Sequence, residues 1–347
     1  MYAKCHMPIM AQEVFDMLLA LRCFDCLQDD GFHPNGVTYV CTLNACGNIK
    51  ALHKGIEIHA KIEKDGMLGT NLAVGNALID MYVKCGLIRK AHEVFNRLRN
   101  QDVVSWTALI AGYAKHGDAM VALKGLDEMQ LKGVAPNAVT YVCCLIACGR
   151  IGDGKKGIEI HAKIEKDGML GTNLAFGNAL IDMYVKCGLM RKAHEVFNRL
   201  PNQDVVSWTA LIAGYAKHGD AMVALKGLDE MQLKGVAPNA VTYVCCLIAC
   251  GRIGDGKEIH EEIVSKGLLE TLALGNALVD MYANCGFLKR ALEVFDILPK
   301  WDVISWNALM SSYVKYEYGI KALNCLAQMQ IEGVNPDFST LVCGLKS

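Results

Sequence analysis

The sequence has little proline, almost no net charge and no long apolar run. Seven prolines and 20% charged residues in a chain of 347 argue against a disordered protein. A formal net charge of -1 gives no overall positive field that would attract nucleic acid. Uncharged stretches such as 133–149, which contains Pro136, are short, so we expect no membrane partner. The N-terminal segment also lacks the pattern of a signal or transit peptide.

Cysteine is abundant, with sixteen residues, but its distribution does not indicate a disulfide framework. Most of the cysteines recur at equivalent places of a repeated pattern, as in KCG at Cys85 and Cys187 and ACG at Cys46, Cys148 and Cys250. We interpret them as small buried side chains in a reducing compartment.

An internal repeat dominates the sequence. Residues 54–155 and 156–257 align without gaps and differ at only three positions. Each block divides further into related units of 35, 36 and 31 residues. Within a unit the apolar residues follow a helical spacing, as at Trp106, Ile110 and Tyr113.

Glycines are expected to end the helices of each unit. Gly86, Gly117 and Gly149 follow the first helix, where a left-handed residue is common. A second turn, such as KGVAPN, closes the second helix. A unit is then a helical hairpin with too little area to fold alone, and stacked neighbours bury one another. The sequence therefore predicts an all-α solenoid of stacked helix-turn-helix repeats.

The segments DVVSWTALIAGYAKHG, GNALIDMYVKCG, AHEVFNRL and GVAPN resemble the motifs of plant pentatricopeptide repeat proteins. The order of unit lengths is similar to the subclass with alternating long (L), short (S) and standard (P) motifs, here without the C-terminal E/DYW extension. The resemblance implies a right-handed superhelix that binds single-stranded RNA in a mitochondrion or chloroplast, one nucleotide per motif. The expected motifs are L 36–71, S 72–102, P 103–137, L 138–173, S 174–204, P 205–239, L 240–271, S 272–302 and P 303–337.

The resemblance also implies that the fifth and last residues of a motif choose the base. Asn with Asp then suggests uridine and Thr with Asn suggests adenine. The long motifs have valine at the fifth position (Val40, Val142, Val244) and read no base, which gives the target 5′-nUAnUAnUU-3′. The predicted reading pairs are Asn76 with Asp102, Thr107 with Asn137, Asn178 with Asp204, Thr209 with Asn239, Asn276 with Asp302, and Asn307 with Asp337.

The chemistry of these residues suits base recognition, but a structural role competes with it. Asn and Thr offer donors and acceptors, whereas ionised Asp offers acceptors only, so the pairs can discriminate between exposed base edges. However, Asp102, Asp204 and Asp302 lie just before a helix, where Asp is a preferred N-cap. Both roles can hold together.

Lysine recurs at the thirteenth position of short and standard motifs. In related proteins this position faces the phosphates, whose attraction is local and depends on salt. The alternative is that each lysine complements a helix dipole. Asn284 interrupts the series, which consists of Lys84, Lys115, Lys186, Lys217 and Lys315.

Two further signals imitate metal sites. Cys23 and Cys26 have zinc-knuckle spacing, and His260 begins a His-x-Glu sequence like that of zinc deaminases. The sequence contains no Pro-Cys-x-x-Cys, and His260 repeats the position of His59 and His161, so we favour a structural role. We expect no enzyme, cofactor or metal, with an editing deaminase or another organellar processing protein as a possible partner in trans. A protein-binding helical scaffold is the alternative function.

Irregularities are expected at three places. The third long motif, 240–271, is four residues shorter than its equivalents, which predicts a distorted stack. Residues 1–35 combine partial, disrupted S and P motifs that meet near Leu18, with one first helix missing. Residues 338–347 begin a truncated L motif, so we expect a truncated array.

Overall fold

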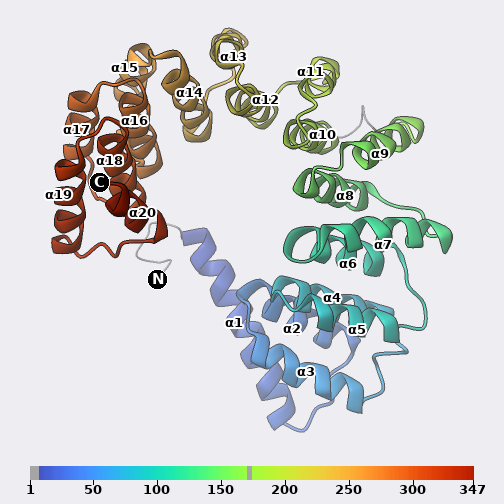
Figure 1. Cartoon of the computed structure of the whole chain (residues 1–347). Helices are drawn as coiled ribbons and strands as arrows, with labels where there is room; N and C mark the ends of the chain where they lie inside the picture. Colours follow the sequence, from blue (N-terminus) through green and yellow to red (C-terminus); the bar gives the residue numbers. More distant parts are fainter. Residues whose placement is uncertain (1–7, 170–173) are drawn as a thin grey trace. The chain divides into compact units, whose positions relative to one another are not determined.

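The computed structural model describes residues 8–169 and 174–347, and throughout these residues every regular element is a helix (Figure 1). The chain forms two compact units, 1–183 and 184–347, which are described separately. None of the described helices has the length and apolar character needed to cross a bilayer. The predicted all-α class is confirmed.

Each hairpin has a first helix that begins at the first residue of a predicted motif. In the first unit and at its border these are α2 (Gly36–Ile49), α4 (Leu72–Lys84), α6 (Val103–His116), α8 (Ala138–Ile151) and α10 (Leu174–Lys186). In the second unit they are α12 (Val205–His218), α14 (Ala240–Ile253), α16 (Leu272–Asn284), α18 (Val303–Lys315) and α20 (Phe338–Lys346).

The second helices are shorter on average. They are α3 (Leu52–Lys64), α5 (Ile88–Arg97), α7 (Ala119–Leu131), α9 (Gly154–Lys166), α11 (Met190–Arg199), α13 (Ala221–Leu233), α15 (Lys257–Ser265), α17 (Leu288–Asp296) and α19 (Gly319–Ile331). A short 3-10 helix, η2 (Leu268–Glu270), follows α15. At the N-terminal side one helix, α1 (Pro8–Asp29), runs without interruption across the predicted junction near Leu18.

The hairpins stack in register within each unit. In the first unit α2, α4, α6 and α8 pack one on the next, and α3, α5 and α7 each bridge to the first helix of the following hairpin. In the second unit α12, α14, α16, α18 and α20 form the same succession. Each unit is therefore a stretch of α-solenoid, in which a hairpin buries its apolar faces only against its neighbours.

Aromatic pairs fill the contact between short and standard motifs. The Phe95 ring on α5 meets the Trp106 ring on α6 edge to face, with centroids 4.7 Å apart, and both side chains are buried. Phe197 and Trp208 repeat this contact at 4.6 Å in the second unit. This edge-to-face geometry is a favoured one for aromatic rings and adds to the stability gained by burying them. The helical spacing predicted from Trp106 thus places the tryptophan in the core.

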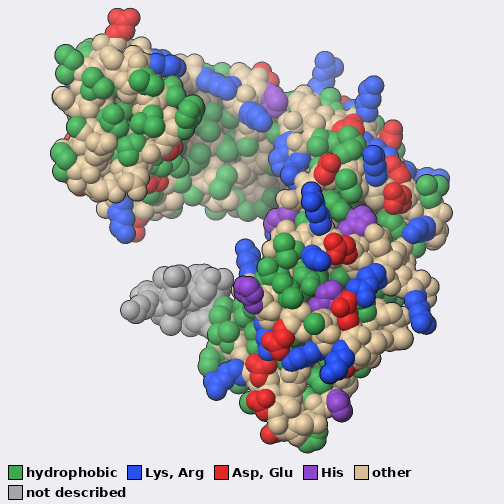
Figure 2. All heavy atoms as spheres, turned by 60° about the horizontal axis from the view of Figure 1, so that its bottom comes forward, with side chains coloured by type: hydrophobic (Ala, Val, Ile, Leu, Met, Phe, Trp, Pro, Cys, Tyr) green, Lys and Arg blue, Asp and Glu red, His purple; other side chains and the backbone are tan. Residues whose placement is uncertain are grey.

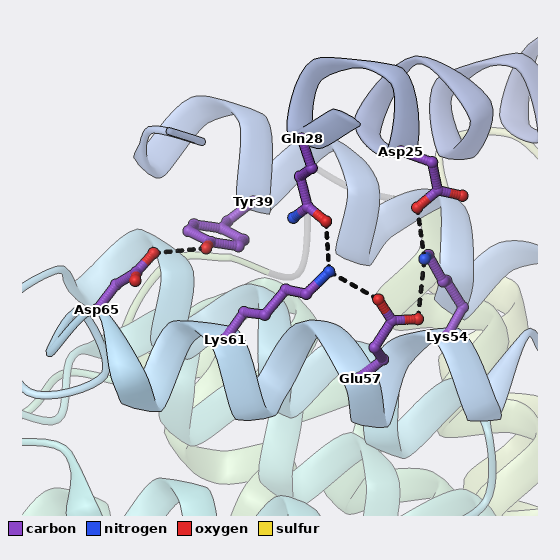
Figure 3. A network of polar contacts seen from close by, with 7 residues as sticks. All are labelled: Asp25, Gln28, Tyr39, Lys54, Glu57, Lys61 and Asp65. Atoms are coloured by element: carbon purple, nitrogen blue, oxygen red, sulfur yellow. Dashed lines mark hydrogen bonds and ion pairs between the residues drawn. The ribbon is translucent and has the colours of Figure 1, made fainter. Parts of the chain in front are cut away.

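Polar and charged side chains also join helix α3 to helix α1. Figure 3 shows Lys54 of α3 between Asp25 of α1, at 2.5 Å, and Glu57 of its own helix, at 2.9 Å. Lys61 contacts Glu57 at 2.7 Å and also donates to Gln28 of α1. Because these groups are partly exposed, the ion pairs fix the register more than they add stability.

A left-handed glycine was predicted after the first helix at three positions, and the structure confirms one of them. Gly86 has φ +80° and ends α4 as expected. Gly117 has φ -119°, so the prediction of a left-handed residue there is wrong. Gly149 is also wrong, because α8 continues through it to Ile151 and Gly152 takes the left-handed conformation with φ +72°. In the equivalent position of α2, Gly47 lies where an added Cβ would be 3.2 Å from the Met81 backbone. This glycine is needed for close approach of two first helices.

The third long motif differs from the others in its second helix. Helix α15 has 9 residues against 13 in α9. Gly256 lies against Met281 as Gly157 lies against Met183, so three of the four missing residues fall between the end of α14 and Gly256. A hollow of about 220 Å³ with Asp229 in its wall lies at this place. The shortening is therefore accommodated locally, between α13, α14 and α15.

Candidate nucleic-acid interface

The last residue of every short and standard motif is fixed at the start of the next first helix. Each side chain accepts a hydrogen bond from a backbone N–H of the first turn, which satisfies a donor that has no partner inside the helix. Asp102 accepts from Ser105 N at 2.9 Å and Asp302 from Ser305 N at 2.8 Å. The N-cap role is therefore real for the whole set: Asp102, Asn137, Asp204, Asn239, Asp302 and Asp337.

In two short motifs the fifth residue donates directly to the last one. Asn76 Nδ2 lies 3.2 Å from Asp102 Oδ1, and Asn276 Nδ2 lies 3.1 Å from Asp302 Oδ1. The Asn76 and Asn276 side-chain carbonyl oxygens are buried without a hydrogen-bond partner. These residues are far apart in sequence but adjacent in space, because consecutive first helices pack side by side. In the third such motif, Asn178 lies on α10 and Asp204 caps α12.

The standard motifs use a different arrangement, which depends on a residue that the sequence analysis missed. Thr107 Oγ1 lies 2.7 Å from Thr140 Oγ1, and Thr140 donates to Asn137 Oδ1 at 2.9 Å. A threonine at the third position of the following motif thus joins the fifth and last residues. The capping-box spacing, with a hydroxyl three residues after the N-cap, was the signal that could have revealed it.

The second unit repeats this arrangement. Thr209 and Thr242 are 2.7 Å apart, and Thr242 donates to Asn239 at 3.0 Å. In the last standard motif Thr340 donates to Asn307 Oδ1 at 2.6 Å, while Asn307 Nδ2 donates to Asp337 at 3.0 Å.

Hydrogen bonds favour the ionised form of two of the aspartates that end a motif. Burial raises the pKa of Asp302, but donation from the Ser305 amide and hydroxyl and from Asn276 outweighs it, and the pKa is lowered. The Thr340 amide and Asn307 lower the pKa of the exposed Asp337. Both groups therefore present acceptors at neutral pH.

These side chains line a continuous hollow in the first unit. Its volume is about 620 Å³, and the fifth residues of three successive motifs, Val40, Asn76 and Thr107, all contribute to its wall. Asn137 lies there as well, next to Val104, which is 51% exposed. Exposed apolar side chains at the second position of the motifs, such as Val104, are a second feature that the sequence analysis missed. They offer a surface on which a flat ring can pack.

The lysines of the thirteenth position fall into two groups. Lys84 Nζ is 2.8 Å from Asp80 and 2.8 Å from Asn48 Oδ1, and Lys315 Nζ is 3.2 Å from Asn284 Oδ1. Within the described part of the chain, the Lys115 and Lys217 ammonium groups have neither a hydrogen bond nor an ion pair. Short motifs carry Asp at the ninth position, one helical turn before the lysine, whereas these two standard motifs carry alanine. The remaining lysine, Lys186, ends α10.

Comparison with known proteins gives the same family throughout. The description "PPR repeat family" matches residues 101–150 and 203–252, and "Pentatricopeptide repeat domain" matches 22–85 and 126–187. A third model, "PPR repeat", matches 76–103, 178–205, 276–303 and 304–334. The chain belongs to the pentatricopeptide repeat family.

Named relatives come from Arabidopsis thaliana. One pentatricopeptide repeat-containing protein, named as chloroplastic, is 37% identical over 90% of this chain and 52% of its own length. A putative one, named as mitochondrial, is 31% identical over 92% of this chain and 53% of its own. The chain therefore spans about half the length of these relatives.

The fold also matches a solved pentatricopeptide repeat structure. PPR10 in complex with an 18-nt psaJ RNA element aligns with 94% of this chain and 55% of its own, with a TM-score of 0.59 and 20% identity. At this identity the likeness concerns the fold, an α-solenoid of pentatricopeptide repeats.

The deaminase-like sequence at His260 is part of the repeat. His260 Nδ1 forms a hydrogen bond of 2.7 Å with Tyr282 Oη of the next first helix, and His59 forms the same bond with Tyr82. Burial lowers the pKa of both imidazoles. Cys23 and Cys26 are exposed on α1. The histidine position thus joins one pentatricopeptide repeat to the next.

Proposed function

We propose that this chain binds single-stranded RNA along the surface formed by the fifth, last and second positions of its motifs, with one nucleotide per motif. The alternating unit lengths of 35, 36 and 31 residues support assignment to the subclass with long, short and standard motifs. The proposed target is 5′-nUAnUAnUU-3′, where n stands opposite a long motif.

One observation carries this proposal: successive motifs place their fifth residues in one hollow. Val40, Asn76 and Thr107 belong to three consecutive first helices and line the same depression of about 620 Å³. An RNA strand that runs along the stacked first helices would meet one fifth residue per motif. Exposed valines beside the polar pairs add apolar contact for base rings, as is usual where proteins hold unstacked bases.

The polarity of the Asn–Asp pairs suits uridine. The Asn76 amide has a second N–H beyond the one given to Asp102, and the Asp102 carboxylate has further acceptor capacity. Uracil presents an acceptor at O4 and a donor at N3, which matches a donor from asparagine and an acceptor from aspartate. The pKa of Asp302 is lowered, so the carboxylate of the last short motif can accept from uracil N3–H in the same way.

Attraction to phosphate would be local. Acidic and basic side chains are interspersed on the face shown in Figure 2, in agreement with the net charge of -1. Lys115 and Lys217, whose ammonium groups are unpaired in the described structure, supply the positive charge along the proposed RNA path. We further propose that the chain selects a transcript site in a mitochondrion or chloroplast, for processing or C-to-U editing by a partner enzyme.

Replacing the capping aspartates by asparagine tests base reading without loss of the cap. Asn is as good an N-cap as Asp, so D102N and D302N should fold normally. Each removes an acceptor-only group, and the preference for uridine over cytidine at nucleotides 2 and 8 should fall about tenfold per site. The measurement is fluorescence anisotropy with the target RNA and its U-to-C variants.

Asp118 provides the matched control. It caps the second helix α7 by accepting from Met120 N at 2.9 Å, and it is not a reading residue. D118N should leave the preference for uridine unchanged. Equal affinity of the wild-type chain for the target and a scrambled RNA would instead favour a protein-binding scaffold.

A further inference from the structure

The standard motifs contain a hydroxyl relay that decides which protons their reading pairs can offer. Thr140 and Thr242, at the third position of the following long motifs, are fully buried. Each lies within hydrogen-bond distance of both members of a reading pair. Neither threonine was among the residues expected to read a base, and their burial excludes direct contact with one.

The direction of the hydrogen bonds follows from the contacts of Thr140 Oγ1. It accepts from the Asn137 backbone N–H at 3.2 Å, and Asn137 Oδ1, 2.9 Å away, can only accept. Thr140 has one hydroxyl proton, which must therefore go to Asn137 Oδ1. The remaining contact, 2.7 Å to Thr107 Oγ1, then requires Thr107 to be the donor.

This assignment fixes what the pair presents to a base. The Thr107 hydroxyl has given its proton to Thr140 and retains only acceptor capacity. Asn137 Oδ1 accepts from the Thr140 amide and hydroxyl, each at 2.9 Å, so the asparagine offers the N–H groups of Nδ2. Nδ2 has no acceptor within the described chain. The pair is an acceptor beside a donor.

We infer that Thr140 and Thr242 are positioning residues that make their motifs select bases with an amino group over bases with a keto group. This inference rests on the proposed RNA binding. Adenine and cytosine present an amino donor beside a ring-nitrogen acceptor, which complements acceptor and donor in the pair. Guanine and uracil present a keto acceptor beside a ring N–H donor. Their keto oxygen would therefore face the threonine oxygen, which can only accept. The second unit repeats the relay with Thr209, Thr242 and Asn239. There the backbone N of Asn239 lies 3.3 Å from Thr242 Oγ1.

The test removes the relay hydroxyl but keeps the shape of the side chain. In T140V/T242V the hydroxyls of Thr107 and Thr209 are free to donate to guanine O6, which removes the acceptor–acceptor mismatch, one of the two mismatches between the pair and guanine. The ratio of affinities for RNA with A and with G at nucleotides 3 and 6 should fall about three- to tenfold per site, the value of one hydrogen bond. Thr→Ser at both positions keeps the hydroxyl and should restore the wild-type ratio. The uridine preference at nucleotides 2 and 5, measured on the same protein, reports that RNA is bound in register.

Thr38 provides the matched control for loss of the capping box. Its hydroxyl donates to Asn35 Oδ1 at 3.0 Å, as Thr140 donates to Asn137, but among the described residues no fifth residue of a preceding motif forms a hydrogen bond with this hydroxyl. T38V should leave the A-to-G ratio unchanged. If the double valine variant does not fold, the single variants decide, because T140V should relax nucleotide 3 only and T242V nucleotide 6 only.

The possible outcomes separate this inference from the function on which it rests. A reduced A-to-G ratio in the valine variants that serine restores supports the relay. An unchanged ratio in the valine variants, or an equal loss in the serine variants, overturns it while RNA binding stands. A wild-type chain that does not distinguish the target from scrambled RNA overturns the proposed function and the relay with it.

Discussion

The two groups of lysines should contribute unequally to RNA binding. Lys115 and Lys217 have unpaired ammonium groups in the described structure, whereas Lys84 is held by Asp80 at 2.8 Å. We predict that K115A/K217A weakens RNA binding and lowers its salt dependence. The charge-neutral double variant D80A/K84A should leave the salt dependence almost unchanged.

The size of the effect follows from counterion release. Each phosphate contact with single-stranded nucleic acid contributes a slope of about 0.7 in a plot of log K against log salt. Loss of two contacts should lower the slope by about 1.4. Between about 50 and 200 mM salt, the affinity gap between wild type and K115A/K217A should therefore narrow by roughly sevenfold.

Anisotropy titrations of the target RNA over that salt range measure the slope. The control is K124A/K226A, which removes the same charge from the same two motifs but from their second helices, α7 and α13. An unchanged slope in K115A/K217A would refute the reasoning. So would an equal change in K124A/K226A, because the effect would then come from net charge rather than from position.

Two further predictions concern the stack itself. An added Cβ at Gly75 would lie 2.4 Å from Leu98 Cδ2, so G75A should reduce the free energy of unfolding by about 1–3 kcal/mol, whereas G125A, 3.2 Å from Ile110 Cγ1, should change it little; equal urea midpoints would contradict this. Burial lowers the pKa of His59 and His260 below the ordinary 6.5, so protons bind the unfolded chain more tightly and stability should fall as the pH drops below about 6.5. Urea unfolding at several pH values should show a smaller pH dependence in H59Q/H260Q than in the wild-type chain, and an equal one would contradict this.

Local sequence was sufficient to predict the helices but not all of their ends. Helical spacing and the Asp and Asn caps act within a few residues, and the first helices begin where these signals place them. Gly117 and Gly149 were assigned wrongly because glycine has more than one use. At Gly47, equivalent to Gly149, it permits close approach of a neighbouring helix, a reason that involves residues far along the chain.

By itself, the sequence determined the repeat, the helical class and the family, since all three depend on periodic spacing within short windows. The tertiary structure alone decided which polar groups meet. It brings Asn76 to Asp102, and it inserts the buried Thr140 between Thr107 and Asn137. It also pairs Lys84 with Asp80 and leaves the Lys115 ammonium group unpaired in the described structure. Hydrogen bonds and ion pairs act over about 3–4 Å, so these outcomes required the stacked helices to be in place.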